Sequence, residues 1–102
     1  MAIVMKISQR FQTGKKIEFM ELEKQFAALE RQGVLLTGER LLPLASREPG
    51  NTLIWQARFP DLAAAEKALE LIASSPEHTR LYDQQKQFMQ DTWLEFYEVL
   101  DY

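Results

Sequence analysis

The only histidine of the chain, His78, is the first side chain that could carry out chemistry. A neutral imidazole can act as a base or as part of a ligand pocket near pH 7. The segment Ser75-Pro76-Glu77-His78 is also typical of a helix start, because Ser75 can accept a hydrogen bond from the His78 backbone N–H and Pro76 suits the first helical position. Three interpretations stay open: a surface residue placed by the helix cap, a pocket residue, or a metal or haem ligand, which a lone histidine without partners at metal-site spacing suits least.

Aromatic and cationic side chains could form a ligand site around such a base. Flat apolar walls with polar tips suit an aromatic ligand, and a guanidinium can stabilise a carboxylate or an enolate. The same types also suit a core, an interface, or salt links to Glu95 or Glu98 across a dimer. The candidates are His78 and Arg58 for catalysis and Trp55, Tyr82, Tyr97 and Arg10 for ligand binding.

Other catalytic patterns are missing from the sequence. It has no glycine-rich phosphate loop, no serine nucleophile elbow and no zinc-ligand spacing. We interpret Glu21 and Glu23 as part of a solvated helix side, and Glu95 and Glu98 alternate on opposite strand faces, so no paired carboxylates are predicted. We therefore expect no metal and no cofactor.

Length and composition predict one globular domain over residues 1–102. The chain is 46% hydrophobic and 26% charged, which allows a core, and its net charge of −3 does not suit a nucleic-acid binder. No apolar stretch approaches the length of a membrane span, and we expect no membrane partner. The absence of cysteine excludes disulfides and thiolate sites and fits a cytoplasmic protein.

Hydrophobic periodicity predicts the elements that must position these residues. Pro43 should place its strand at a sheet edge because proline has no N–H to donate, whereas "TLIWQARF" can lie inside the sheet. Asp61 is a typical N-cap. The expected elements are a strand at 3–11, a helix at 15–33, two strands within 34–59 that turn at 48–51, helices at 61–75 and 76–89, and a strand at 91–100.

Apolar spacing also predicts which side of each helix faces the sheet. Residues three or four positions apart lie on one helix face. In the second long helix this spacing selects Leu62, Ala65, Leu69 and Ile72. In the first it selects Phe19, Leu22, Phe26 and Leu29.

The order of the elements predicts an α+β fold, a ferredoxin-like β-α-β-β-α-β sandwich with helices on one face of a four-stranded antiparallel sheet. The last strand has aromatic or apolar residues on both faces, so the face without helices would expose some of them. Rows of large apolar side chains on an open sheet are typical of an interface. We expect a homodimer in which two such sheets form a dimeric barrel.

The segment from Trp55 to Leu100, with its strand, Ala-rich helix, "SSPEHTRL" and aromatic strand, resembles small dimeric α+β barrel proteins. These include antibiotic-biosynthesis-monooxygenase-like and NIPSNAP-like domains. The resemblance implies a cofactor-independent monooxygenase-like enzyme acting on a small aromatic or polyketide-like ligand. The alternative is a non-catalytic, small-ligand-binding or stress-related dimeric module, so whether the protein is an enzyme stays open.

Overall fold

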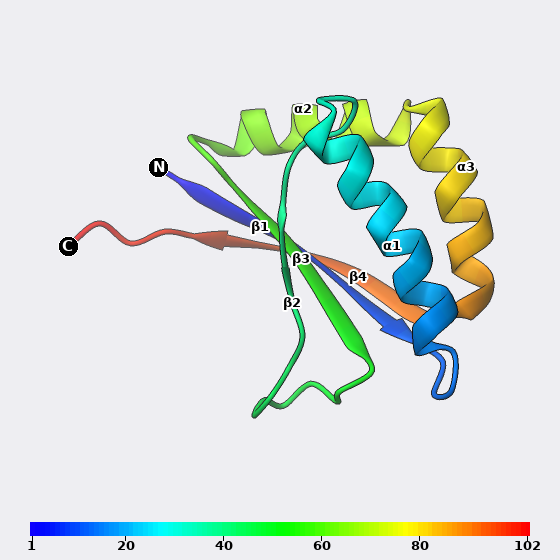
Figure 1. The fold of residues 1–102 in the computed structure, drawn as a ribbon. Helices are drawn as coiled ribbons and strands as arrows, with labels where there is room; N and C mark the ends of the chain where they lie inside the picture. Colours follow the sequence, from blue (N-terminus) through cyan, green and yellow to red (C-terminus); the bar gives the residue numbers. More distant parts are fainter.

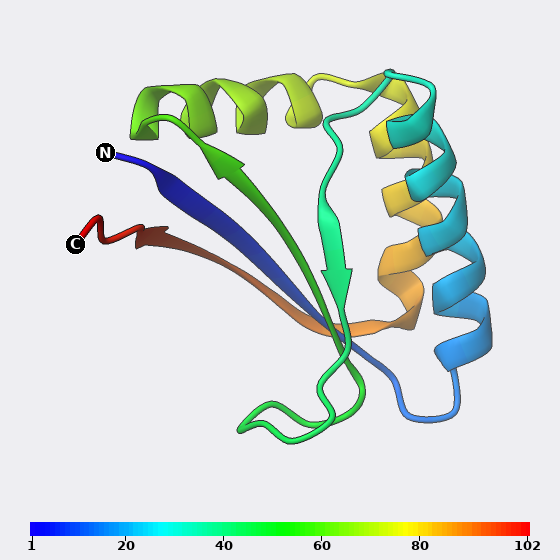
Figure 2. The same ribbon diagram turned by 60° about the vertical axis from the view of Figure 1, so that its left-hand side comes forward.

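The computed structural model describes all residues from Met1 to Tyr102 and has the predicted α+β architecture. Four antiparallel strands form one sheet in the order β2-β3-β1-β4, and the helices cover one of its faces (Figures 1 and 2). The elements are β1 (Ile3–Phe11), α1 (Lys16–Arg31), β2 (Glu39–Leu41), β3 (Thr52–Phe59), α2 (Leu62–Ala73), α3 (Pro76–Gln85), the 3-10 turn η1 (Lys86–Phe88) and β4 (Met89–Glu98).

The central strand β1 shows how side chains divide between the two faces. Met5 and Ile7 lie opposite Ala57 and Trp55 of β3, and all four point toward the helices. Because neighbouring residues of a strand alternate, the other face carries the intervening side chains. We call it the open face; its residues include Val4, Lys6, Ser8 and Arg10 of β1, Gln56 and Arg58 of β3, and Trp93, Glu95 and Tyr97 of β4.

The connection before β3 differs from the predicted hairpin. Only Glu39–Leu41 pair with β3, and residues 42–51 form a long loop in place of a second full strand and a tight turn. Pro43 follows the short strand and has no N–H with which to continue the ladder. The loop is held to the end of β1 by Asn51, whose side-chain amide donates to the Phe11 carbonyl at 2.7 Å. The edge position of this strand is confirmed.

The helices begin where the sequence predicts. The Asp61 side chain accepts from the Ala64 N–H at 2.8 Å, and Ser75 accepts from the His78 N–H at 3.3 Å, so both N-caps are confirmed. The prediction that Leu62 faces inward was wrong, since it is 42% exposed. It is the first residue of α2, which begins three positions after β3 ends.

The core lies between the sheet and the helices in three neighbouring clusters. One joins the sheet to α2, the second lies where β1 meets the start of α1, and the third joins α1 to α3. Their buried members are Ile3, Met5, Trp55, Phe59, Ala65 and Ala68; Phe11, Phe19 and Leu53; and Leu22, Phe26 and Leu81. None of the helices has the length and apolar character that crossing a membrane requires.

Candidate functional site

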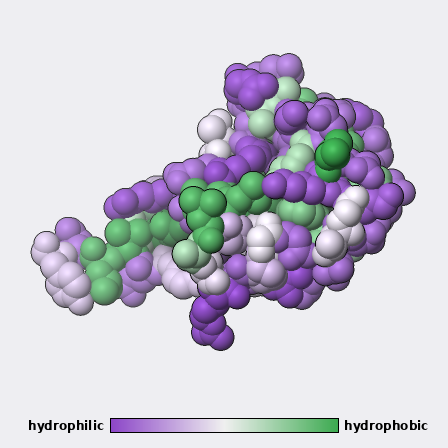
Figure 3. Space-filling view, turned by 60° about the horizontal axis from the view of Figure 1, so that its bottom comes forward, coloured by the Kyte–Doolittle hydropathy of each residue, from purple (hydrophilic) through white to green (hydrophobic).

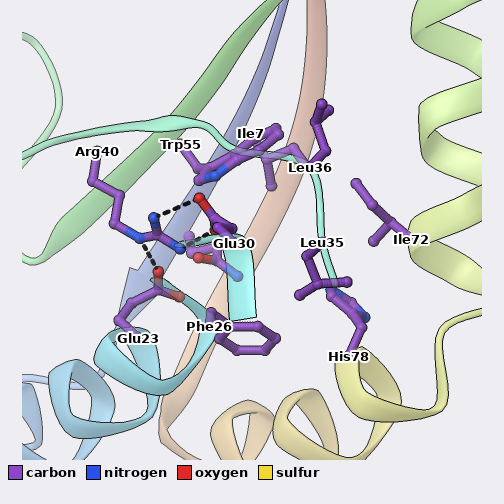
Figure 4. A pocket seen from close by; sticks show the side chains of 11 residues that line it. Ile7, Glu23, Phe26, Glu30, Leu35, Leu36, Arg40, Trp55, Ile72 and His78 are labelled. Carbon is purple, nitrogen blue, oxygen red and sulfur yellow. Dashed lines mark hydrogen bonds and ion pairs between the residues drawn. The ribbon is translucent and has the colours of Figure 1, made fainter. Parts of the chain in front are cut away.

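A cavity of about 70 Å³ lies between the sheet and the helices, and we call it the helix–sheet pocket. Its walls come from β1, β3, α1, α3, the end of α2 and the segment that leads from α1 into β2. Charged groups gather on one side, and Leu35, Ile72 and His78 stand on the other (Figure 4). The pocket therefore combines a polar wall with an apolar one.

The polar wall is an ion cluster of Glu23, Arg40 and Glu30, here called the Glu–Arg–Glu cluster. The Arg40 Nε donates to Glu23 at 2.6 Å, and its two terminal nitrogens both donate to Glu30. Both carboxylate side chains are only 7% exposed, against 22% for the Arg40 side chain. Burial by itself would lower the pKa of Arg40, but the hydrogen bonds and charges of Glu30 and Glu23 outweigh that effect and raise it.

Further hydrogen bonds fix the two carboxylates. The Gly38 N–H donates to Glu30 at 2.9 Å, and the side-chain amide of Gln85 donates to Glu23 at 2.9 Å. Gln85 has no exposed surface, and its side-chain carbonyl oxygen has no hydrogen-bond partner. Gly38 lies so close to the Trp55 indole that a Cβ at this position would come within 2.0 Å of it. The cluster is thus anchored to α3 and to the segment that approaches β2.

His78 lies on the other side of the pocket and is half-buried. Its ring centroid is 5.3 Å from that of Phe26 and 5.9 Å from that of Tyr82, which it stacks on at an interplanar angle of 11°. Burial lowers the pKa of His78, and the charge of Glu23 opposes part of this effect. At neutral pH the imidazole is therefore uncharged and can accept a proton.

The structure brings together only part of the predicted site. His78 and Trp55 line the pocket, while Tyr82 packs against the histidine ring from the adjacent turn of α3. Arg58, Arg10 and Tyr97 belong to the open face, on the opposite side of the sheet.

Arg10 and Tyr97 have partners on the open face. Arg10 pairs with Glu48 at 3.0 Å and lies 5.3 Å from the Trp93 ring. The Tyr97 hydroxyl donates to Glu95 at 2.9 Å, and this hydrogen bond raises the pKa of Tyr97. Arg10 thus binds a loop carboxylate and not Glu95 or Glu98 of its own chain.

Sequence reasoning missed Glu23, Glu30 and Arg40. The interpretation of Glu23 as solvated was wrong, because it is 6% exposed and faces the sheet with Phe26. A signal was present in the spacing, since Glu23 is four positions after Phe19 and Glu30 is four positions after Phe26. Both glutamates therefore lie on the apolar stripe of α1, where a charged residue needs a buried partner.

The structure contains no group of three or more His, Cys, Asp or Glu side chains arranged to hold a metal ion. The acidic side chains of the pocket are instead occupied by Arg40, Gly38 and Gln85.

Comparison with known proteins gives matches by structure alone. No protein-family model and no curated protein sequence matches this chain. A NIPSNAP family protein from Agrobacterium tumefaciens superposes with a TM-score of 0.80 at 13% identity, covering 99% of this chain and 88% of that one. An uncharacterised NIPSNAP domain protein from Burkholderia xenovorans gives 0.76 at 15% identity, covering 98% and 95%. An antibiotic biosynthesis monooxygenase gives 0.69 at 16%, covering 99% and 100%.

These matches confirm the resemblance noted in the sequence at the level of the fold. At such identities they establish the architecture, while activity has to be argued from the site.

Proposed function

We propose that the protein binds a small organic ligand in the helix–sheet pocket and works as a homodimer. The observation that carries the proposal is the pocket itself, in which buried polar groups converge on a cavity with an apolar wall. Such a combination is typical of small-molecule sites, where a few placed polar groups orient an otherwise apolar ligand.

The size of the pocket favours binding of a compact ligand over the turnover of a polyketide-like one. Small-molecule sites commonly have volumes of about 300–1,000 Å³, so a cavity of about 70 Å³ suits only a compact ligand. A polycyclic substrate would have to leave most of its rings outside.

The charge of the polar wall also favours ligand binding over turnover. Two carboxylates face one guanidinium, which both of them already bind. A substrate enolate formed here would add negative charge beside negative charge, and Arg58, which could have offset it, lies on the other face of the sheet. The pocket is therefore better suited to holding a ligand than to stabilising a carbanion.

A second candidate, a cofactor-independent monooxygenase, is favoured by one observation: an uncharged His78 lines the pocket. The imidazole would take a proton from an activated C–H bond of the ligand. The carbanion would then reduce dioxygen, with one oxygen atom retained in the product and the other leaving as water.

Binding can be tested by ¹H–¹⁵N NMR with compact organic molecules, both charged and neutral. We expect shift changes centred on the amides of Leu35, Gly38 and His78. Leu36→Trp should block the pocket and remove these changes. Leu71→Trp, on the exposed side of α2, is the matched control. If no molecule of any charge type shifts these amides, the binding function is refuted.

The two candidates differ in their response to His78→Ala. A monooxygenase should lose oxygen consumption with any bound molecule while it retains binding. A binding protein should show no oxygen consumption before or after the substitution. Consumption that survives His78→Ala would exclude the histidine as the base.

The homodimer is supported by the open face, which carries the half-buried Trp93 and the 47% exposed Tyr97. The hydroxyls of Ser8 and Thr52 on the same face are buried and have no partner. A band of hydrophobic side chains also runs toward the end of the molecule that carries both termini (Figure 3). A second sheet packed here would cover these aromatic groups.

Size-exclusion chromatography with light scattering tests the dimer directly. We expect twice the chain mass of 11.9 kDa, and a monomer at micromolar concentration would contradict the proposal. Trp93→Glu should give monomers, whereas Leu71→Glu on the helix side should not.

A further inference from the structure

We propose that the ligand of the helix–sheet pocket is a compact, uncharged molecule whose polar end both donates and accepts hydrogen bonds, as a short alcohol or primary amide does. This inference rests on the proposed binding function and specifies the class of ligand. It depends on which polar groups of the pocket already have partners and which do not.

The two carboxylates of the pocket already have their partners. Glu23 accepts from the Arg40 Nε at 2.6 Å and from the Gln85 amide at 2.9 Å. Glu30 accepts from both terminal nitrogens of Arg40 and from the Gly38 N–H. An ammonium ion would therefore lose its hydration without gaining a free carboxylate, and an anion would meet two negative charges around a guanidinium that is already paired. Neither charged class suits this cavity.

The polar side chains that remain free are three uncharged ones, Gln9, Trp55 and His78. All three line the cavity, and none of their side-chain nitrogen or oxygen atoms is hydrogen-bonded within the chain. The Gln85 carbonyl oxygen is unpartnered and enclosed, whereas the free polar atoms of these three side chains are not enclosed. A ligand in the cavity can therefore reach them.

The three free side chains together offer donors and acceptors but no charge. The Trp55 indole only donates, the Gln9 amide both donates and accepts, and a neutral imidazole has one nitrogen of each kind. The half-buried position of His78 beside the Phe26 and Tyr82 rings favours that neutral form. A hydroxyl or a primary amide can accept from one of these groups and donate to another. It is thus the kind of polar group that the pocket leaves room to bind.

The apolar wall sets the rest of the ligand. Leu35, Leu36 and Ile72 line the cavity together with the ring of Phe26 (Figure 4). Because the cavity measures only about 70 Å³, a short branched alkyl group suits it better than a ring system.

Two pairs of probes, matched in shape and different in charge, test the inference: isovaleramide with isovalerate, and isopentanol with isopentylamine. Each would be titrated at neutral pH into the full chain and followed by NMR at the amides of Gly38 and His78. We expect the uncharged member of each pair to bind at least roughly tenfold more tightly, because a charged group would lose its water without gaining a free partner.

The contact to Gln9 is tested by Gln9→Leu, which keeps a similar size and removes the amide. It should weaken binding of isovaleramide and isopentanol by roughly three- to tenfold, the value of one hydrogen bond. Gln25→Leu is the matched control, since Gln25 is exposed on α1 and does not line the cavity. This control should leave both affinities unchanged.

Each outcome separates this inference from the proposed function. If isovalerate or isopentylamine binds as tightly as its uncharged counterpart, the uncharged class is refuted although the pocket still binds ligands. Equal affinities for Gln9→Leu and Gln25→Leu would refute the assigned contact to Gln9. If no small molecule of any charge shifts the pocket amides, both proposals fail. If Gln9→Leu does not fold, the two pairs of probes on the unmodified chain still decide the class.

Discussion

Replacing Arg40 with methionine should destabilise the protein far more than loss of a surface ion pair would. Methionine keeps much of the length and apolar stem of arginine but removes the charge and all five N–H donors. Glu23 and Glu30 would then face each other's charge in a buried setting, held only by Gln85 and Gly38. A buried charge that has lost its partner destabilises the folded state by much more than the intact ion pair stabilised it.

The magnitude follows from burial. Removing one partner of a buried ion pair costs about 3–5 kcal/mol. The Arg40 side chain is 22% exposed, so water can partly replace it, and we expect the lower value of about 3 kcal/mol. For a domain of this size each kcal/mol lowers Tm by about 4–8 °C, which gives a decrease of roughly 12–24 °C.

The assay is urea denaturation at neutral pH, repeated at lower pH. The loss in unfolding free energy should shrink as the pH falls, because protonation of the stranded carboxylates removes the buried charge. Lys24→Met is the matched control, because it breaks the surface ion pair between Lys24 and Glu21, whose side chains are 74% and 62% exposed respectively. This variant should lower the free energy of unfolding by less than about 1 kcal/mol. A loss for Arg40→Met no larger than the control, or one that does not change with pH, would refute the reasoning.

Two further predictions concern the pocket walls. Gly38→Ala should lower the free energy of unfolding by about 1–3 kcal/mol and change tryptophan fluorescence, because the new Cβ would lie 2.0 Å from the Trp55 indole. Gly50→Ala is the control, since a Cβ at position 50 would have nothing within 4 Å. Equal Tm values for the two variants would contradict the packing around Gly38. Burial lowers the pKa of His78 from 6.5, so below pH 6.5 the unfolded chain binds more protons than the folded chain. The free energy of unfolding should therefore fall as the pH drops through 6.5, and this loss should level off below the folded-state pKa. Denaturation midpoints measured across this range should show a smaller slope in His78→Gln, and an unchanged slope would exclude the histidine as the source.

Most elements could be predicted because their signals are local. The alternation in 3–11 predicts β1 at its observed bounds, and the side chains of Asp61 and Ser75 predict both helix starts. Such signals depend on side chains within a few positions of one another, so tertiary contacts are not needed to recognise them.

The hairpin before β3 was predicted less well because its limits depend on distant partners. A strand exists only where a neighbour accepts its hydrogen bonds, and within residues 34–51 only Glu39–Leu41 pair with β3. The rest of that segment is held by contacts from β1, through Phe11 to Asn51 and Arg10 to Glu48. These pairs are about forty positions apart in sequence, and no local pattern indicates them.

The candidate site divides in the same way. The sequence by itself determined that His78 follows a helix cap and that Trp55 lies on an inner strand, because capping and alternation are local properties. Only the tertiary structure decided that Arg40 of the edge strand binds Glu23 and Glu30, and that Arg58 lies on the open face, away from the pocket. Ion pairs between elements depend on the distance and burial that packing creates, and a residue's type and spacing do not specify either.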